Sequence, residues 1–200
     1  MKSCRSKRAN PISPIDDPDA ALEAWMEHEE ILFRALERSI VKEKLVSGFA
    51  EVDDFISFSL SVQNRRKSRV GHALENHLAA IFDANDLRYE RGARTENNSR
   101  PDFLFPGSKE YHNTAIGSPP LRMLGAKTTC KDRWRQVLAE AARIPEKHLF
   151  TLETSISENQ LREMNTASLV VVSTPTVLAT YPIYQERMTI TLNDFISIVR

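Results

Sequence analysis

The chain has 200 residues, 41% of them hydrophobic and 27% charged, which suits one globular domain that can bury a substantial core. Its 27 Lys and Arg balance its 27 Asp and Glu, which excludes a protein that coats nucleic acid through a positive net charge. With Cys4 and Cys130 as its two cysteines, the sequence contains neither a disulfide framework nor a zinc cluster.

The N-terminal stretch is polar and contains Pro11, Pro14 and Pro18, so we expect residues 1–18 to form a disordered tail. The basic N-terminus is not followed by an apolar segment, which excludes a secretory signal. No apolar run approaches the ~20 residues that a membrane span needs. We therefore expect a cytoplasmic protein.

Apolar residues recur at three- and four-residue steps between Asp19 and Val46, which predicts a helix that ends at Gly48. The members of this pattern are Leu22, Trp25, Met26, Leu32, Phe33, Leu36 and Ile40. A second, short helix is predicted after Asp53 from the apolar residues Phe55, Ile56 and Leu60. Residues 19–62 are therefore expected to form an N-terminal helical region.

A basic stretch follows, Ser61-Val-Gln-Asn-Arg-Arg-Lys-Ser-Arg69, which we predict as a turn that leads into a helix. The helix is indicated by one apolar face made of Val70, Leu74, Leu78, Ile81 and Phe82. Four cations at a helix start would oppose the helix dipole. A nearby phosphate backbone would explain their presence better than a solvated face does.

The remainder of the chain alternates between predicted strands and helices. Strands are predicted at 102–105, 121–129, 148–152 and 168–173, and helices at 132–143, from 155 or 157 to 165, and from 193. Residues 84–100 and 107–120 are predicted to be irregular. This order predicts an α/β fold over residues 63–200, with a mixed central sheet flanked by helices.

Three charged side chains are placed where they can form a catalytic site. Asp102 begins one predicted strand, Lys127 follows the apolar run of the next, and Glu140 lies on the helix after it. Two carboxylates can hold Mg²⁺, which activates water and polarises a phosphodiester. A lysine can stabilise the charge that develops on the attacked phosphate. In the alternative interpretation, Asp102 is a turn residue and Lys127 a solvated strand end.

Further charged residues can serve the same site. Glu75 is either a solvated helix acid, which is the commoner case, or a third carboxylate near the metal. Local basic clusters could touch a nucleic acid, and they comprise Arg65, Arg66, Lys67 and Arg69; Arg88, Arg91, Arg94 and Arg100; and Lys131, Arg133 and Arg135.

Four segments give the chain a resemblance to the EcoRII-type restriction endonucleases, in their C-terminal catalytic domain. They are Asn64–Arg69, Pro101–Pro106, Lys127–Gln136 and His148–Leu152, in the same order and with similar spacing. The resemblance covers roughly residues 45 to 200. It implies a restriction-endonuclease-like fold of the PD-(D/E)xK superfamily, and Mg²⁺-dependent double-strand cleavage of DNA by a homodimer.

The resemblance also implies roles for single residues of the metal site. Asp102 and Lys127 match the catalytic acid and lysine of the family. The position two residues before the lysine, which carries an acid in the usual pattern, is Gly125 here. The family's variant pattern takes that acid from the following helix, where it matches Glu140. An upstream helix glutamate of the family matches Glu75.

DNA recognition is implied in the same way. Lys131, Asp132 and Arg133 match a segment that reads guanine and cytosine edges, and the expected site is CCWGG, where W is A or T. Asn64 matches a minor-groove residue, and the neighbouring Arg65, Arg66, Lys67 and Arg69 are expected to bind DNA. Relatives flip the central bases out of the helix, and Trp25 or Met26 is the nearest candidate to stack on them.

The resemblance also bears on the partners of the chain. Residues 19–62 are expected to contribute to dimerisation and DNA contact, and no separate N-terminal effector domain is expected. A cognate DNA methyltransferase is expected genetically, as in restriction–modification, but not as a bound partner. The alternatives are a repair or structure-specific nuclease on the same fold, and a DNA-binding module that has lost cleavage.

Overall fold

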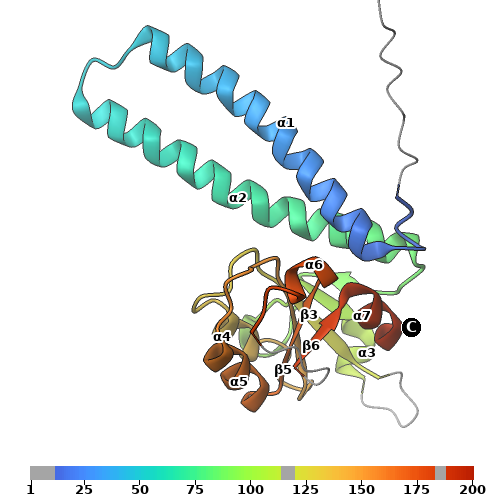
Figure 1. Cartoon of the computed structure of the whole chain (residues 1–200). Helices are drawn as coiled ribbons and strands as arrows, with labels where there is room; N and C mark the ends of the chain where they lie inside the picture. The colour runs from blue at the N-terminus through green and yellow to red at the C-terminus, as the bar shows by residue number, and fades with distance from the viewer. Residues whose placement is uncertain (1–11, 114–119, 183–187) are drawn as a thin grey trace, which may run out of the picture.

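Two long helices form a hairpin that projects from a sheet domain (Figure 1). The computed structural model describes residues 12–113, 120–182 and 188–200. Helix α1 spans Pro18–Ser47, and the predicted helix at 19–46 is thereby confirmed. It begins where Asp17 accepts a hydrogen bond from the Ala20 backbone N–H at 2.9 Å, with proline in the first turn.

Helix α2 spans Val52–Ala84 without a break, so the predicted turn in the basic stretch 61–69 is wrong. This stretch contains no glycine or proline, and Arg, Lys and Gln are good helix formers. The cations therefore lie inside a helix and not at its start, and the argument from the helix dipole does not apply to them. The boundary expected between residues 62 and 63 also lies within this helix.

Ion pairs between the two helices explain part of the basic stretch. Arg66 binds the buried Glu37 of α1 through two hydrogen bonds of 2.7 and 2.5 Å. Arg69 binds Glu30 of α1, and its guanidinium lies 3.9 Å from the centre of the Phe33 ring. The hydrogen bond from Arg66 holds the pKa of Glu37 below its ordinary value. These contacts fix the register of the hairpin.

The start of the hairpin is anchored on the sheet domain. Residues 1–11 of the predicted tail lie outside the described residues, whereas residues 12–17 are ordered, contrary to expectation. Asn85 donates a hydrogen bond to the Pro14 carbonyl at 3.0 Å. Asp19 accepts hydrogen bonds from the backbone N–H groups of Leu192 and Asn193 at 3.0 and 3.1 Å. These two contacts supply the order that the polar composition does not predict.

The described residues form one mixed sheet whose strands follow the order β1–β2–β3–β4–β5–β6. The strands are β1 (Glu90–Arg91), β2 (Phe103–Phe105), β3 (Arg122–Ala126), β4 (Lys147–Phe150), β5 (Leu169–Ser173) and β6 (Thr189–Thr191). Strands β1 to β3 pair antiparallel, and β3 to β6 pair parallel. The predicted mixed sheet with helices is confirmed.

Helices cover both faces of this sheet (Figure 1). They are α3 (Ser108–His112), α4 (Trp134–Leu138), α5 (Glu158–Thr166), α6 (Pro175–Leu178) and α7 (Leu192–Val199), with a 3₁₀ turn at Glu96–Asn98. Alternate residues of β3 enter different cores. Met123 packs with α4, α5 and α6, whereas Leu124 packs with α2 and α7.

Some predicted boundaries were wrong. The helix predicted at 132–143 is only the five residues of α4, so Glu140 lies in the turn after it. Helix α3 lies in the segment predicted as a loop, of which 114–119 fall outside the described residues. Among the described residues, no helix is long and apolar enough to cross a membrane.

Candidate active site

Asp102 and Lys127 meet at one end of the sheet. Asp102 directly precedes β2 and Lys127 directly follows β3, and these antiparallel neighbours place Phe103 opposite Leu124. One oxygen of Asp102, Oδ2, accepts hydrogen bonds from Lys127 Nζ and from the Ala126 backbone N–H, each at 2.6 Å. Both side chains are mostly buried, with 17% and 12% exposed. The predicted acid–lysine pair is therefore assembled.

Glu140 is a second acid beside this pair. Its Oε2 is buried and accepts no hydrogen bond from the residues that the structure describes. Burial raises the pKa of Glu140 to about 7, the charge of Lys127 opposes that shift, and the charge of Asp102 adds to it. A buried carboxylate oxygen without a partner is costly, and a bound cation is one way to satisfy it.

These residues fit a divalent cation that has few protein ligands. Among the described residues, no group of three or more His, Cys, Asp and Glu side chains is arranged to hold a metal ion. Asp102 and Glu140 would thus be the protein ligands of a hard cation such as Mg²⁺, which keeps several waters and needs only one or two carboxylates plus substrate phosphate.

A buried lysine, Lys147, holds the backbone at Glu140 in place. Lys147 Nζ donates hydrogen bonds to the carbonyls of Glu140 and Ala141 at 2.6 and 2.5 Å. Ala141 has a φ of +46°, a conformation that costs energy for a residue with a Cβ. Thr95 Oγ1 accepts a hydrogen bond from the Ala141 N–H at 3.4 Å. These contacts fix the direction in which Glu140 leaves the turn.

Gly125 explains why the second acid comes from this turn. A Cβ on Gly125 would lie 2.8 Å from a methyl group of Val137, so α4 fills the space that a side chain would need. The last residue of α4 is Leu138, and Glu140 follows two positions later. Helix α4 therefore excludes an acidic side chain from position 125, and the turn that follows this helix carries Glu140.

Gly125→Ala is expected to destabilise the protein by about 1–3 kcal/mol, the usual cost of overpacking a core. Val137→Ala removes the methyl groups that cause the clash, so the double variant should lose less stability than the two single losses added together. Thermal or urea unfolding of the three variants measures this coupling. Strictly additive losses would show that Gly125 and Val137 do not compete for the same space.

Glu75 reaches the same region from α2. It lines a pocket of about 170 Å³ with Lys127 and Arg133. Its carboxylate accepts a hydrogen bond from Arg91 of β1 at 3.3 Å. The remaining residues that line this pocket are Lys67, Ser68, Gly71, His72, Ala126 and Thr128. The structure thus places Glu75 beside Lys127, with basic and polar side chains around them.

The predicted recognition residues lie in the turn between β3 and α4. Lys131, Asp132 and Arg133 are all exposed. Asp132 accepts a hydrogen bond from Arg135 at 3.1 Å, and the Lys131 carbonyl accepts one from Gln160 at 3.3 Å. This turn follows directly from the strand that ends beside Lys127, and Arg133 lines the same pocket as Lys127.

The basic residues of α2 differ in what they already contact. Arg66 and Arg69 are bound to carboxylates of α1, so a DNA contact from either would compete with an ion pair of the hairpin. Asn64, Arg65 and Lys67 are exposed. Lys67 lines the pocket that contains Lys127, whereas Arg65, Arg66 and Arg69 do not.

Trp25 and Met26 lie on α1 near its start and are half-buried. Both pack against the core between α2, α7 and the sheet. The ring centroid of Trp25 lies 5.7 Å from that of His77 on α2. Both side chains therefore already have packing partners within the chain, and stacking on a base remains a prediction for each.

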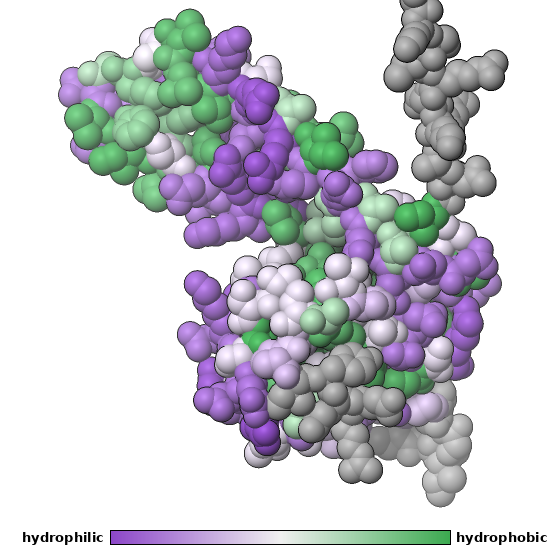
Figure 2. Space-filling model, in the orientation of Figure 1, coloured by the Kyte–Doolittle hydropathy of each residue, from purple (hydrophilic) through white to green (hydrophobic). Residues whose placement is uncertain are grey.

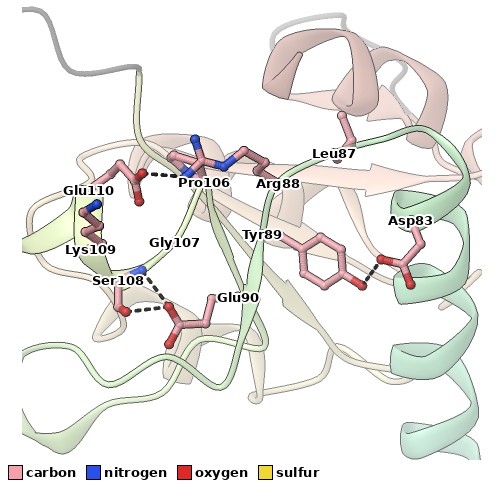
Figure 3. Close-up of a pocket in the computed structure, with 10 residues that line it drawn as sticks. All are labelled: Asp83, Leu87, Arg88, Tyr89, Glu90, Pro106, Gly107, Ser108, Lys109 and Glu110. Atoms are coloured by element: carbon pink, nitrogen blue, oxygen red, sulfur yellow. Dashed lines mark hydrogen bonds and ion pairs between the residues drawn. The ribbon is translucent and has the colours of Figure 1, made fainter.

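A larger pocket, of about 560 Å³, lies away from this site, between the end of α2 and the start of α3 (Figure 3). Its carboxylates already have partners: Asp83 accepts from Tyr89, Glu90 from Ser108, and Glu110 from Arg88. None of Asp102, Lys127 and Glu140 lines it, whereas Lys127, the partner of Asp102, lines the smaller pocket. We therefore assign the chemistry to the smaller pocket and not to this one.

Several residues of the site were not predicted from the sequence. Lys147 was missed because a lysine at the start of a strand gives no sign of burial. Ser68, Gly71 and His72 were missed although they precede Glu75 at helical spacing, and that spacing was the available signal. Because residues 61–69 were predicted to form a turn, Ser68 was not recognised as part of the same helix face as Gly71, His72 and Glu75.

Comparison with solved structures identifies the class of fold to which this chain belongs. The fold is that of solved restriction endonucleases. The chain superposes on metal-depleted Ecl18kI in complex with uncleaved, modified DNA, with a TM-score of 0.76 and 21% identity, over 95% of this chain and 71% of that one. It superposes on the restriction endonuclease PspGI–substrate DNA complex with a TM-score of 0.71 and 15% identity, over 91% and 78% of the two chains.

The chain belongs to the EcoRII C-terminal family, whose model matches residues 33–196. It is 43% identical to the type II restriction enzyme EcoRII of Escherichia coli, over 90% of this chain and 45% of that protein. It is 27% identical to the type II restriction enzyme SsoII of Shigella sonnei, over 75% of this chain and 56% of that protein. The chain thus spans about half the length of these two relatives.

Proposed function

We propose that this chain is a type II restriction endonuclease that makes Mg²⁺-dependent double-strand cuts at a short DNA site. The observation that carries the proposal is the convergence of Asp102, Lys127 and Glu140 at one end of the sheet, where the buried Oε2 of Glu140 has no hydrogen-bond partner among the residues that the structure describes. Membership in the EcoRII C-terminal family, and the titles of the similar structures, which name DNA complexes, support DNA as the substrate.

Each residue has a defined part in this chemistry. Asp102 and Glu140 would hold Mg²⁺, which when bound supplies a Lewis acid and an activated water. Lys127 would place its ammonium beside the attacked phosphate, where negative charge develops. Asp102 keeps that ammonium in place through its 2.6 Å hydrogen bond. Glu75 would assist from α2, either at the metal or beside a ligand of the metal.

Two other functions use the same fold, and one digest separates them from the proposal. A plasmid is incubated with the protein in Mg²⁺ and, in parallel, in EDTA. Discrete fragments in Mg²⁺ alone are expected from a restriction endonuclease. Binding without cleavage in Mg²⁺ would indicate a DNA-binding module, and cleavage without sequence-defined bands would indicate a repair or structure-specific nuclease.

The proposed recognition site is CCWGG. Arg133 and Asp132 would read the outer pairs, because arginine pairs bidentately with guanine and an aspartate accepts from the cytosine amino group. At the centre, bases flipped from the helix would be discriminated by the cost of unstacking and by the pocket that receives them. An A·T pair opens more easily than a G·C pair, which favours W at that position. Trp25 and Met26 remain the candidates to stack there.

Arg133→Ala is expected to lose about 1–3 kcal/mol of discrimination at each outer C·G pair, since it removes a bidentate base contact. Lys67→Ala is the matched control, because a phosphate contact should weaken binding to all sequences about equally and lower the salt slope by about one. Competition binding with single-base variants of the site measures both effects. Unchanged preference in Arg133→Ala would show that Arg133 does not read these pairs.

We also propose a homodimer, in which each protomer cuts one strand of a nearly palindromic site. The hairpin carries a large exposed apolar surface, which gathers over its far end (Figure 2). We call it the hairpin apolar surface, and it consists of Ile31, Leu32, Leu36, Ile40, Leu45, Val46, Val52, Phe55, Ile56 and Leu60. An exposed apolar patch of this kind marks an interaction site.

A further inference from the structure

Gly71 lies in the interior of helix α2, where glycine is the least favourable residue after proline. Its backbone does not require glycine, since Gly71 has an ordinary helical conformation, unlike Gly48 and Gly92, whose φ values of +73° and +59° lie in the left-handed region. Its packing does not require glycine either. A Cβ at Gly71 would meet no heavy atom within 4 Å, whereas one at Gly125 would meet Val137 at 2.8 Å.

The position of Gly71 in the fold gives a different reason for a glycine inside this helix. Ser68, Gly71, His72 and Glu75 lie at positions i, i+3, i+4 and i+7 of α2, which form one face of a helix. All four line the pocket that contains Lys127. The open space above Gly71 is therefore the space directly beside the catalytic lysine.

The charge around this space identifies what fills it. Lys67, Lys127 and Arg133 line the pocket with Glu75 as the acid, so its lining carries a positive net charge. Ser68 and Thr128 add hydroxyl groups, which can donate to a phosphate oxygen. An apolar partner would not find a matching surface here, whereas a phosphodiester backbone would.

We propose that the sugar–phosphate backbone of the DNA strand being cut lies directly against α2 at Gly71, where the missing side chain lets it approach the helix. The inference rests on the proposed function, because it needs DNA in this pocket. It assigns Gly71 as a binding residue for a phosphodiester, with Ser68 and His72 on either side of it. The cost of glycine to the helix is then offset by the closer approach of the strand.

The test uses Gly71→Ala and Gly71→Leu in the full chain, with Ala80→Leu as the matched control. Ala80 is exposed on the same helix and does not line the pocket. Binding to a labelled duplex that contains CCAGG is measured by fluorescence anisotropy without divalent metal, at several salt concentrations. Thermal unfolding and sedimentation velocity without DNA are measured on the same samples.

Stability and binding should change in opposite directions. Gly71→Ala should raise Tm by ~2–4 °C, since alanine favours the helix. It should weaken DNA binding about tenfold, because the added methyl group would hold the phosphate away from the pocket and so cost about one charge-assisted hydrogen bond. Gly71→Leu should weaken binding further and lower the salt slope by about one. Ala80→Leu should bind as the wild type does.

Other outcomes would overturn the inference. A folded Gly71→Leu variant that binds the duplex as tightly as the wild type would show that no strand passes there. A change in oligomeric state without DNA would show that this face meets a second copy of the chain. If the wild type itself does not bind the duplex, the proposed function fails, which is distinct from failure at Gly71 alone.

Discussion

Lys127→Ala and Asp102→Ala are each expected to reduce DNA cleavage by more than about a hundredfold, a loss above ~2.7 kcal/mol of transition-state stabilisation. Lys127→Ala removes the ammonium that we propose faces the attacked phosphate. Asp102→Ala removes a proposed metal ligand and also the acceptor of the hydrogen bonds from Lys127 and the Ala126 N–H. Single-turnover cleavage of a duplex with one site, in saturating Mg²⁺, measures the rate of the chemical step.

Matched variants separate catalysis from folding. Asp102→Asn keeps an oxygen that can accept from the Ala126 N–H but loses the negative charge, so it should fold normally and still be inactive. Lys109→Ala removes an exposed lysine that lies away from the site and should cleave normally. If the Lys127 or Asp102 alanine variant retains more than about a hundredth of the wild-type rate, the catalytic assignment is wrong.

Charged substitutions in the hairpin apolar surface are expected to convert the proposed dimer into a monomer. Leu32 and Phe55 lie on different helices of the hairpin and are 69% and 49% exposed. A two-fold interface contains each substitution twice, so Leu32→Glu with Phe55→Glu would bury four unpaired charges. Dimer affinity should fall by more than about a hundredfold, because several kcal/mol are lost.

Sedimentation velocity measures the association, and plasmid cleavage measures its consequence. The monomeric variant should produce nicked circles slowly, where the wild type produces linear DNA. Lys42→Glu is the control, since it changes an exposed charge on α1 without removing an apolar side chain. A wild type that sediments as a monomer both free and on DNA would count against paired strand cleavage.

Local patterns in the sequence identified the parts of the site that lie on strand ends. Asp102 begins β2 and Lys127 follows β3, and apolar runs mark both strands in the sequence. Glu140 was predicted as the second acid and lies close enough to Asp102 and Lys127 for their charges to affect its pKa, but the helix on which it was expected ends at Leu138. The ammonium of the buried Lys147 donates hydrogen bonds to the carbonyls of Glu140 and Ala141 in the turn that follows α4. Such a contact across the turn leaves no periodic signal.

The hairpin shows a different limit. The apolar spacing of α1 is visible in the sequence, but Arg66 of the basic stretch pairs with Glu37, which lies 29 residues earlier in the chain. A sequence window that contains only the basic stretch therefore resembles a solvated or DNA-binding turn. Strands β1 and β6 were missed because two or three residues carry too little alternation to be recognised.

Mapping the ends of cleaved DNA tests most directly whether this pocket makes site-specific double-strand cuts. A duplex with one CCWGG site, labelled on each strand in turn, is incubated with the wild-type protein in Mg²⁺ or in EDTA. We predict one break in each strand, directly before the first cytosine of the site, in Mg²⁺ alone, and no break in a duplex whose site is scrambled. Breaks scattered along both duplexes in Mg²⁺, or an intact duplex that the protein nevertheless binds, would contradict the proposed endonuclease.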